Sequence, residues 1–395
     1  MRIGFDVSQT GRLKAGCGYF ADSLIRGLSD IDAMNEYLLY PTFGDFYFDP
    51  EWQTTTVKVD GIRMGRGLAH ETREAARAFW SRPPVDLEAQ LGHPDVVHAN
   101  NFFCPTTLCK AGLVYTLYDL SFLEDPEWTT EANRSGCFDG VFNASLYADR
   151  IIAISQYSRR HFLETFPHYP SERVVVVPPA SRFTHRGAIA HPESLPPLEP
   201  AQFWLSVGTL EPRKNQRRLL RAYAGLRARW GRTFPLVLAG GQGWMMNDFE
   251  KLVAELGLGS DVILTGYVSD ETLQWLYQNC FAFVYPSLFE GFGLPVLEAM
   301  SCGAAVITST TTSLPEIVES AGVLVDPRRE EAITGAMRQL SIGEIDREML
   351  KQQGLEQSAR FSWRQTAEQT RDVYHEVIGE KHGGAERLNP SPQPR

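Results

Sequence analysis

The 395-residue chain lacks several features that would each point to a particular class of protein. Its six cysteines form no C-x-x-C pair, so neither a zinc site nor a thiol redox motif is indicated. The net charge of −10 argues against a nucleic-acid binder, which would show a basic footprint. No apolar run approaches the length of a membrane span, and residues 1–7 form a strand pattern rather than a signal peptide. We therefore expect a cytoplasmic protein with reduced thiols.

Positive charge is concentrated in one segment, from Arg63 to Arg82. Its basic residues (Arg63, Arg66, Arg73, Arg77) alternate with apolar ones (Leu68, Ala75, Ala76, Phe79, Trp80). A solvated helix face is the expectation for such a pattern. The alternative is a surface that makes peripheral contact with anionic lipid at the inner face of the membrane.

Short apolar runs alternate with helical patterns along the chain, which is typical of parallel α/β architecture. Predicted strands of the first half cover 3–7, 96–98, 113–117, 151–154 and 174–177, and the second half restarts with a strand at 203–208 and a helix at 215–230. Periodicity is lost and prolines accumulate between them. We expect a first domain over 1–180, a linker over 181–200, a second domain over 201–360, a helix over 361–380 and a disordered tail over 381–395.

The most informative segment is 283–315, FVYPSLFEGFGLPVLEAMSCGAAVITSTTTSLP. Two strand-like runs flank a glycine-rich loop and a short helix, and Gly291 and Gly293 allow a sharp turn with close approach to a ligand. Free backbone N–H groups at the start of the helix favour an anion there. Glu290 precedes the turn and Glu298 lies in the helix. A ligand with both phosphates and hydroxyls, such as a nucleotide sugar, suits this loop.

Two other interpretations of this carboxylate pair are weaker. Eight residues of helix span about 12 Å, whereas carboxylates that cleave one glycosidic bond lie about 5–9.5 Å apart. The remaining alternative is that Glu290 is solvated and Glu298 lies on an exposed helix face. Two contacts on one long ligand explain the loop better.

A second motif, VGTLEPRKN at 207–215, follows a predicted strand and precedes a helix. Arg213 and Lys214 can supply positive charge to a diphosphate leaving group. The alternative is an exposed basic pair at a helix start, where the helix dipole makes cations slightly unfavourable. That mismatch favours an anionic ligand.

Three motifs together resemble the retaining glycosyltransferases of family 4: Glu290-x7-Glu298, the 207–215 segment, and LTGYVSD at 264–270. The resemblance extends from Arg2 to about Ile378, and the chain is most similar to bacterial mannosyltransferases of surface polysaccharide assembly. It implies the GT-B fold, in which two Rossmann-like domains face each other across a cleft and a C-terminal helix crosses back to the first domain. It also implies retaining transfer of a hexose, with mannose from GDP-mannose expected, to an oligosaccharide or glycolipid acceptor without a metal or other cofactor.

The resemblance also implies roles for individual residues. Glu298 would bind the ribose, Glu290 the donor sugar, and Lys214 with Arg213 the diphosphate. The expected donor site further comprises Gly16, Gly18, Gly208, Thr209, Tyr267, Val268, Gly291, Phe292, Gly293 and Leu294. For Tyr267 and Val268 core packing is an equal alternative to contact with the base. Gly16 and Gly18 begin nine residues beyond the first strand, and this spacing does not fit a dinucleotide fingerprint. At this position the family has a glycine-rich loop that closes over the donor phosphates.

The chain departs from the family at two positions. Tyr118 stands before Asp119 where the family often has histidine, and Thr209 stands where the family often has arginine. Tyr118 is expected among the catalytic residues as a hydrogen-bond donor to the reacting sugar, although tyrosine is a poor base at neutral pH. Asp119 is the next catalytic candidate near the acceptor. His98 and Asn100 are expected on the acceptor side, with a structural role an equal alternative for His98. The motif loops contain no Asp-x-Asp metal motif. Two rival functions are a nucleotide-sugar epimerase of the same fold and a non-catalytic sugar-nucleotide sensor.

Overall fold

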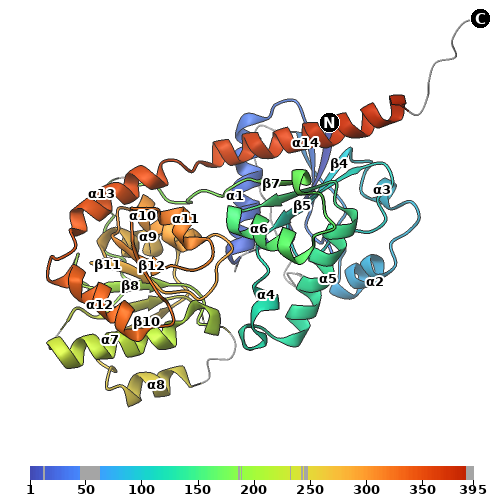
Figure 1. The fold of residues 1–395 in the computed structure, drawn as a ribbon. Coiled ribbons are helices and arrows are strands. Elements are labelled where there is room, and N and C mark those ends of the chain that lie inside the picture. The colour runs from blue at the N-terminus through green and yellow to red at the C-terminus, as the bar shows by residue number, and fades with distance from the viewer. Residues whose placement is uncertain are drawn as a thin grey trace, which may run out of the picture. The chain divides into compact units, whose positions relative to one another are not determined.

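The computed structural model describes residues 1–11, 14–44, 63–185, 187, 189–231, 233–241, 243 and 248–387. The chain forms two compact units, each built around a parallel β-sheet (Figure 1). Unit 1 comprises Met1–Leu123, Glu131–Pro179 and Trp363–Arg395, and unit 2 comprises Glu124–Thr130 and Ala180–Ser362.

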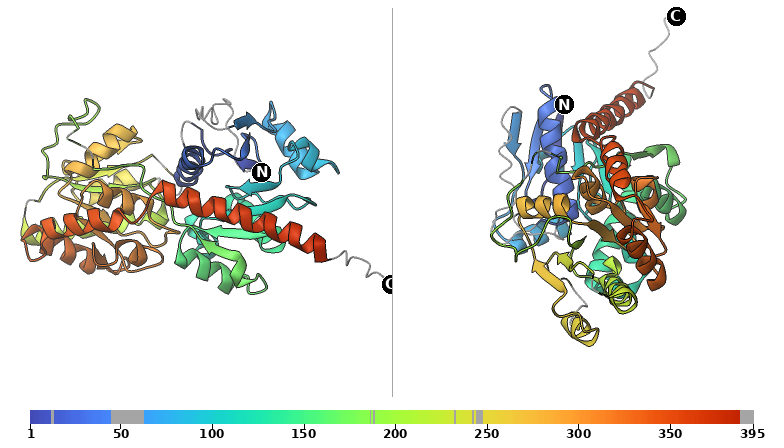
Figure 2. Two further views of the ribbon diagram at one scale, coloured as in Figure 1. Left: turned by 90° about the horizontal axis from the view of Figure 1, so that it is seen from above. Right: turned by 90° about the vertical axis from the view of Figure 1, so that its left-hand side faces the viewer.

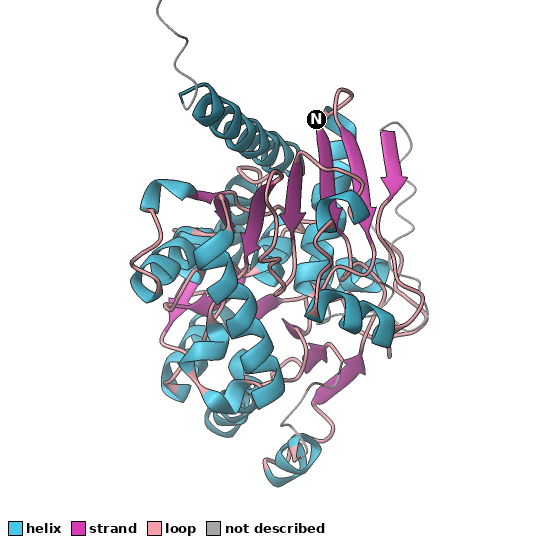
Figure 3. Ribbon diagram, turned by 90° about the vertical axis from the view of Figure 1, so that its right-hand side faces the viewer, coloured by secondary structure: helices cyan, strands magenta, loops and turns pink. Residues whose placement is uncertain are grey.

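Unit 1 contains a seven-stranded sheet in the order β3-β2-β1-β4-β5-β6-β7. Its strands are β1 (Arg2–Asp6), β2 (Glu36–Tyr40), β3 (Arg63–Arg66), β4 (Val96–Ala99), β5 (Gly112–Leu117), β6 (Arg150–Ala153) and β7 (Val174–Val176). Strands β4, β5 and β6 are buried along their whole length. Helices lie in front of and behind the strands (Figure 3), which explains why these strands are nearly continuous apolar runs.

The helices of unit 1 are α1 (Gly16–Ile31), α2 (Arg73–Ser81), α3 (Leu87–Gln90), α4 (Ser121–Glu124), α5 (Glu131–Tyr147), α6 (Gln156–Thr165) and α14 (Trp363–Arg387), with η2 (Ser171–Arg173) as a short 3-10 turn. Helix α14 returns from the far end of the sequence and packs beside α1 (Figure 2). A Cβ on Gly27 of α1 would lie 2.9 Å from the Trp363 carbonyl oxygen, so only glycine permits this approach. The helix ends later than the predicted 380, and the predicted tail is helical through Arg387; residues 388–395 lie outside the described part.

The basic segment Arg63–Arg82 is not one helix, contrary to the expectation from its pattern. It contains strand β3 and helix α2. Trp80 is buried and donates from Nε1 to the Thr42 carbonyl at 2.9 Å, and Phe79 packs against the same core. Trp80 and Phe79 therefore stabilise unit 1, and Arg73 and Arg77 are exposed; the side chains of Arg63 and Arg66 lie outside the described part. Within the described residues no helix is both long and apolar enough to cross a membrane.

Unit 2 contains a six-stranded sheet in the order β10-β9-β8-β11-β12-β13. Its strands are β8 (Trp204–Val207), β9 (Leu236–Ala239), β10 (Val262–Gly266), β11 (Ala282–Tyr285), β12 (Val306–Ser309) and β13 (Val323–Val325). Its helices are α7 (Gln216–Trp230), α8 (Phe249–Glu255), α9 (Asp270–Asn279), α10 (Leu294–Ser301), α11 (Leu314–Val318), α12 (Glu330–Ser341) and α13 (Arg347–Ser358), with 3-10 turns η1 (Pro126–Trp128) and η3 (Pro212–Lys214).

Two segments belong to unit 2 that the sequence did not assign to it. Residues 124–130 leave unit 1 between α4 and α5, and the Trp128 ring lies 6.1 Å from that of Phe289. The predicted linker 181–200 is also part of unit 2 from Ala180 onward. The predicted end of the first domain at residue 180 lies within one residue of the division between the units, whereas residues 124–130 and the predicted linker 181–200 group with unit 2.

Candidate functional site

The loops that follow β8 and β11 carry the predicted charged residues of unit 2. These strands are neighbours in the sheet and run parallel, so their carboxyl ends lie at one edge. Ligands of open α/β sheets bind outside this edge. Arg213 and Lys214 end the turn η3 after β8, and Glu290 lies five residues after β11. The structure thus brings these three residues together.

Glu290 lies at the centre of this cluster. Its Oε1 accepts hydrogen bonds from Lys214 Nζ at 2.7 Å, Tyr285 OH at 2.8 Å and Ser287 Oγ at 2.6 Å. Its Oε2 accepts from Arg213 Nη1 at 3.1 Å. Only 6% of Glu290 is exposed, so the solvated-glutamate interpretation is wrong.

The surroundings keep the Glu290 carboxylate ionised. Burial alone would raise its pKa, but the charges of Lys214 and Arg213 and the hydrogen bonds they donate outweigh burial and lower the pKa to about 2. A group with this pKa holds no proton to donate at neutral pH. Glu290 can accept hydrogen bonds from sugar hydroxyls or orient the cations, but it cannot serve as the general acid of a glycosidase.

The two cations are shared with a second carboxylate. Arg213 Nη2 donates to Glu211 Oε1 at 2.7 Å, and Glu211 is almost completely buried. The side chains of Lys214 and Arg213 are only 12% and 18% exposed, so they are not an exposed basic pair. Two cations face two carboxylates, which makes the cluster close to neutral. Glu211 lies inside the 207–215 motif but was not predicted as a site residue.

The turn into α10 is shaped by Gly293, whose φ of 109° lies in the left-handed region. A Cβ there would also lie 2.6 Å from Leu314 Cδ2, so a larger residue is excluded. Ser313 Oγ lies 2.9 Å from the Glu290 carbonyl oxygen and 2.8 Å from the Phe292 carbonyl oxygen, and its single hydroxyl proton can be shared between them to fix the loop. Within the described residues the N–H groups of Phe292, Gly293 and Leu294 have no protein acceptor. These N–H groups can therefore donate to a bound ligand, as the predicted donor-site role requires. Gly291 lies in the same loop.

Glu298 is buried in the second turn of α10, and both carboxylate oxygens have protein partners. Oε1 accepts from Arg182 Nε at 2.7 Å, and Oε2 accepts from Tyr277 OH at 3.3 Å. The interpretation of Glu298 as an exposed helix residue is therefore wrong. Arg182 was not predicted, because it lies in the proline-rich segment interpreted as a linker.

The remaining predicted donor residues lie at the same edge of unit 2. Gly208 follows β8 with a φ of 138°, and a Cβ on Gly240 after β9 would lie 2.1 Å from the Gly208 carbonyl oxygen. Thr209 accepts at its carbonyl from Gln216 Nε2 at 3.0 Å. Tyr267 is 54% exposed and Val268 is half-buried, both just beyond β10. Core packing is therefore the wrong interpretation for Tyr267.

In unit 1 Gly16 and Gly18 lie in the first turn of α1 and not in a separate loop. A Cβ on Gly18 would lie 2.1 Å from the Gln9 carbonyl oxygen, so this glycine allows the chain after β1 to pass close to the helix. Gly16 is exposed with open space around it. The first turn of a helix still presents N–H groups to an anion.

Tyr118 is 6% exposed, and its hydroxyl donates to the Asn100 carbonyl at 2.8 Å; it also lies 3.3 Å from the Cys17 carbonyl. The structure therefore brings Tyr118 beside the start of α1. Asp119 is half-buried, and its Oδ1 accepts from the Ser121 backbone N–H at 2.9 Å. This bond closes the turn before α4.

His98 and Asn100 are structural, and the prediction that they contact an acceptor is not supported. His98 is fully buried in β4, with Nδ1 at 2.6 Å from Tyr374 OH and Nε2 at 2.8 Å from Thr116 Oγ1. Burial lowers its pKa to about 3, so it is neutral. Asn100 is 1% exposed; its backbone N–H donates to Asp6 Oδ2 and its Oδ1 accepts from Thr116.

Metal ligands are not gathered in the described part of the chain. No group of three or more His, Cys, Asp or Glu side chains there is placed to hold an ion. The Asp30-Ile31-Asp32 spacing lies at the end of α1, where Asp32 accepts from Asn35 Nδ2 at 2.6 Å and Tyr37 OH at 2.8 Å. All six cysteines are free thiols.

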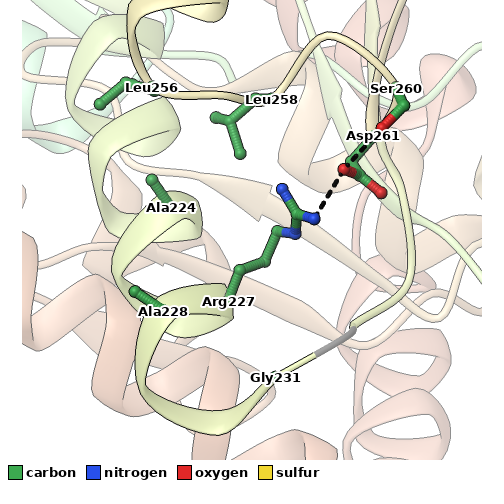
Figure 4. Close-up of a pocket in the computed structure, with 8 residues that line it drawn as sticks. All are labelled: Ala224, Arg227, Ala228, Gly231, Leu256, Leu258, Ser260 and Asp261. Atoms are coloured by element: carbon green, nitrogen blue, oxygen red, sulfur yellow. Dashed lines mark hydrogen bonds and ion pairs between the residues drawn. The ribbon is translucent and has the colours of Figure 1, made fainter.

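A hollow of about 680 Å³ lies elsewhere on unit 2 (Figure 4). Arg227 of α7 projects across it and pairs with Asp261 at 2.9 Å. Asp261 precedes β10, so the hollow is at the amino-terminal edge of the strands, away from the Glu290 cluster. None of the predicted site residues lines it.

Comparison with known proteins identifies the family of both halves. The family described as "Glycosyltransferase Family 4" matches residues 16–180, and "Glycosyl transferases group 1" matches residues 190–357. The chain is 37% identical to O-antigen chain mannosyltransferase B of Escherichia coli over 318 residues, 75% of this chain and 82% of that protein. It is also 37% identical over 227 residues to the serotype-specific mannosyltransferase WbdA of Escherichia coli, of which the match covers 28%.

Solved structures share the fold at low sequence identity. HepE from Anabaena, solved with UDP and glucose, superposes with a TM-score of 0.71 at 18% identity, covering 95% of this chain and all of that one. WaaG, a glycosyltransferase of lipopolysaccharide biosynthesis, superposes with a TM-score of 0.69 at 16% identity, covering 94% and 99%. The GT-B fold predicted from the sequence is thereby confirmed. The chain belongs to the family 4 glycosyltransferases.

Proposed function

We propose that the protein is a retaining mannosyltransferase that transfers mannose from GDP-mannose to a saccharide or lipid-linked saccharide. The similarity to an O-antigen chain mannosyltransferase over 75% of the chain carries this proposal. Other bacterial relatives with shorter matches are named as mannosyltransferases as well.

The Glu290 cluster fits the chemistry of this reaction. Negative charge grows on the diphosphate as the bond to the sugar breaks, and preorganised cations stabilise that charge. Lys214 and Arg213 are held in place by Glu290 and Glu211 before any ligand arrives. We assign the diphosphate to these cations and to the N–H groups at the start of α10. No metal is needed in this scheme.

Proton transfer follows from the ionised state of Glu290. A carboxylate with a pKa of about 2 cannot protonate the leaving group or take the acceptor proton efficiently at neutral pH. We propose that Glu290 accepts hydrogen bonds from sugar hydroxyls, and that the departing phosphate takes the acceptor proton as the acceptor attacks on the same face.

A cytoplasmic location at the inner face of the membrane fits a lipid-linked acceptor. Trp80 and Phe79 of the Arg63–Arg82 segment pack in the core of unit 1, whereas Arg73 and Arg77 are exposed and could meet anionic lipid.

Incubation of the purified protein with GDP-mannose, GDP-fucose, UDP-glucose and UDP-galactose, each with a mannose-terminated oligosaccharide, tests the donor. Mass spectrometry should detect one added hexose with GDP-mannose only, and the new linkage should have the anomeric configuration of the donor by NMR. Transfer only from a UDP-sugar would contradict the proposed donor.

The same assay tests the metal-free scheme and the two rival functions. Turnover should persist in EDTA; loss in EDTA with recovery in manganese would overturn the metal-free scheme. Conversion of the donor sugar without acceptor would favour an epimerase. Donor binding without turnover on any acceptor would favour a sensor.

A further inference from the structure

The segment from Ala180, where this part of unit 2 begins, forms hydrogen bonds with α9 and α10. Ser181 Oγ lies 2.6 Å from Ser301 Oγ, and Gln274 Nε2 donates to the Thr184 carbonyl at 3.0 Å. His185 Nδ1 lies 3.1 Å from the Cys302 carbonyl oxygen. The backbone on both sides of Arg182 is therefore anchored to the two helices that frame Glu298.

Arg182 spans these helices with its guanidinium group. Nε donates to Glu298 Oε1 at 2.7 Å, and Nη1 donates to Asp270 Oδ1 at 2.8 Å. The guanidinium carbon lies 4.8 Å from the centre of the Phe183 ring, and the side chain is 14% exposed. A lysine could pair with one carboxylate but lacks the planar fork that spans both.

The protein bonds of Glu298 leave each carboxylate oxygen with a remaining site. A carboxylate has about four lone-pair sites. Arg182 uses one on Oε1 and Tyr277 uses one on Oε2. One site on each oxygen is then left, which matches the two O–H donors of a vicinal diol.

We propose that Arg182 is a positioning residue of the nucleotide site. It fixes the rotation of the Glu298 carboxylate so that the two remaining lone pairs meet the 2′- and 3′-hydroxyls of the donor ribose. The proposal rests on the proposed function, because it assigns Glu298 to the nucleotide. It adds that the recognition of ribose depends on a residue outside the motif loops.

Calorimetric titration of the full chain with GDP and with 2′,3′-dideoxy-GDP tests this role. Arg182→Gln should weaken GDP binding about tenfold or more, because a charged hydrogen bond that orients the carboxylate is lost. Binding of dideoxy-GDP should not change, since that ligand has no diol to recognise. The GDP affinity of Arg182→Lys should lie between those of wild type and Arg182→Gln. Arg360→Gln, which removes an exposed ion pair with Glu319, is the matched control.

Two further measurements separate positioning from a general loss of structure. In the Glu298→Gln background, Arg182→Gln should cause no further loss of GDP affinity. In the transfer assay, Arg182→Gln should raise the donor KM more than it lowers kcat. Thermal melts give the temperature range in which Arg182→Gln and Glu298→Gln stay folded, and the titrations are made within that range.

Equal weakening of GDP and dideoxy-GDP, or unchanged GDP affinity, would overturn the role of Arg182. Failure of the wild-type protein to bind either GDP or UDP would overturn it together with the nucleotide site. Ribose-dependent binding that requires Arg182, without sugar transfer, would leave this role standing and overturn only the proposed function.

Discussion

His98 in unit 1 and Glu290 in unit 2 are both buried ionisable side chains near the carboxyl ends of parallel strands, but their surroundings are opposite. Two hydroxyl groups contact His98, and burial holds its pKa near 3. Glu290 receives hydrogen bonds from two cations and two hydroxyls, and its pKa is about 2. His98 is therefore neutral at pH 7, whereas Glu290 is ionised and its charge is matched by two cations. Burial alone therefore does not identify a functional residue; buried charge with matched partners is the better indicator.

Glu290→Gln should give the largest effect, because it tests the charged side of this comparison. The amide leaves Lys214 and Arg213 without their carboxylate, and removal of one partner from a buried ion pair costs about 3–5 kcal/mol. We expect turnover to fall by about a thousandfold, with a lower melting temperature. Initial rates measured well below the melting temperature separate the two effects. Turnover within tenfold of wild type would show that the carboxylate has no role in transfer.

Lys214→Ala should give the next largest effect, mainly on kcat. Charge on the diphosphate is greatest in the transition state, so loss of this cation should lower kcat about a hundredfold while donor binding changes less. Arg221→Ala, at a half-exposed position on α7, is the matched control and should leave kcat unchanged. A large increase in KM with an unaltered kcat would assign Lys214 to ground-state binding.

His98→Gln tests the neutral side of the comparison through pH. The folded pKa of His98 is below the ordinary value of about 6.5, so as pH falls the unfolded chain takes up its proton first. Stability present above pH 6.5 is therefore lost as pH falls toward 3, at about 1.4 kcal/mol per pH unit. Glutamine stays neutral, so the stability difference between wild type and variant should shrink by about 2 kcal/mol from pH 7.5 to pH 5.

Urea unfolding of both proteins at the two pH values measures this difference. Asp6, whose pKa burial raises to about 7, changes stability in the opposite direction, but it does so in both proteins and cancels in the comparison. A constant difference between pH 7.5 and pH 5 would show that His98 titrates in the folded protein as it does in the unfolded chain, which would contradict the lowered pKa. Turnover of the folded variant should stay close to wild type.

The parts of the fold that the sequence could predict are those with strong local patterns. Strands β4, β5 and β6 are nearly continuous apolar runs and were predicted within one residue of their ends. Strand β3 was missed because it pairs only with β2 at the sheet edge, and its sequence RMGR has no apolar pattern. Each of the two charged motifs of unit 2, 207–215 and 290–298, was recognised because its own residues are close in sequence.

The errors concern contacts between residues far apart in the chain. Arg182 and Glu298 are separated by 116 positions, and the proline-rich composition around Arg182 suggested a linker. For His98 the sequence left an acceptor-side and a structural role equally open, and the contact with Tyr374 of α14, 276 positions away, favours the structural one. A local sequence pattern indicates neither the Arg182–Glu298 nor the His98–Tyr374 contact, so the roles of Arg182 and His98 could be assigned only from the structure.

The smallest expected effect is at Tyr118, which lies between the two cases: it is buried like His98 but was predicted to be catalytic. Its hydroxyl donates to the Asn100 carbonyl, so Tyr118→Phe leaves that buried acceptor without this bond. We expect a loss of about 1 kcal/mol in the free energy of unfolding and turnover within twofold of wild type. Tyr118→His should destabilise more, because a smaller, polar ring replaces a phenol packed edge-on against Phe20. Melts and initial rates on both variants decide this: a Phe variant with wild-type stability but reduced turnover would show that the Tyr118 hydroxyl reaches the donor sugar during the reaction.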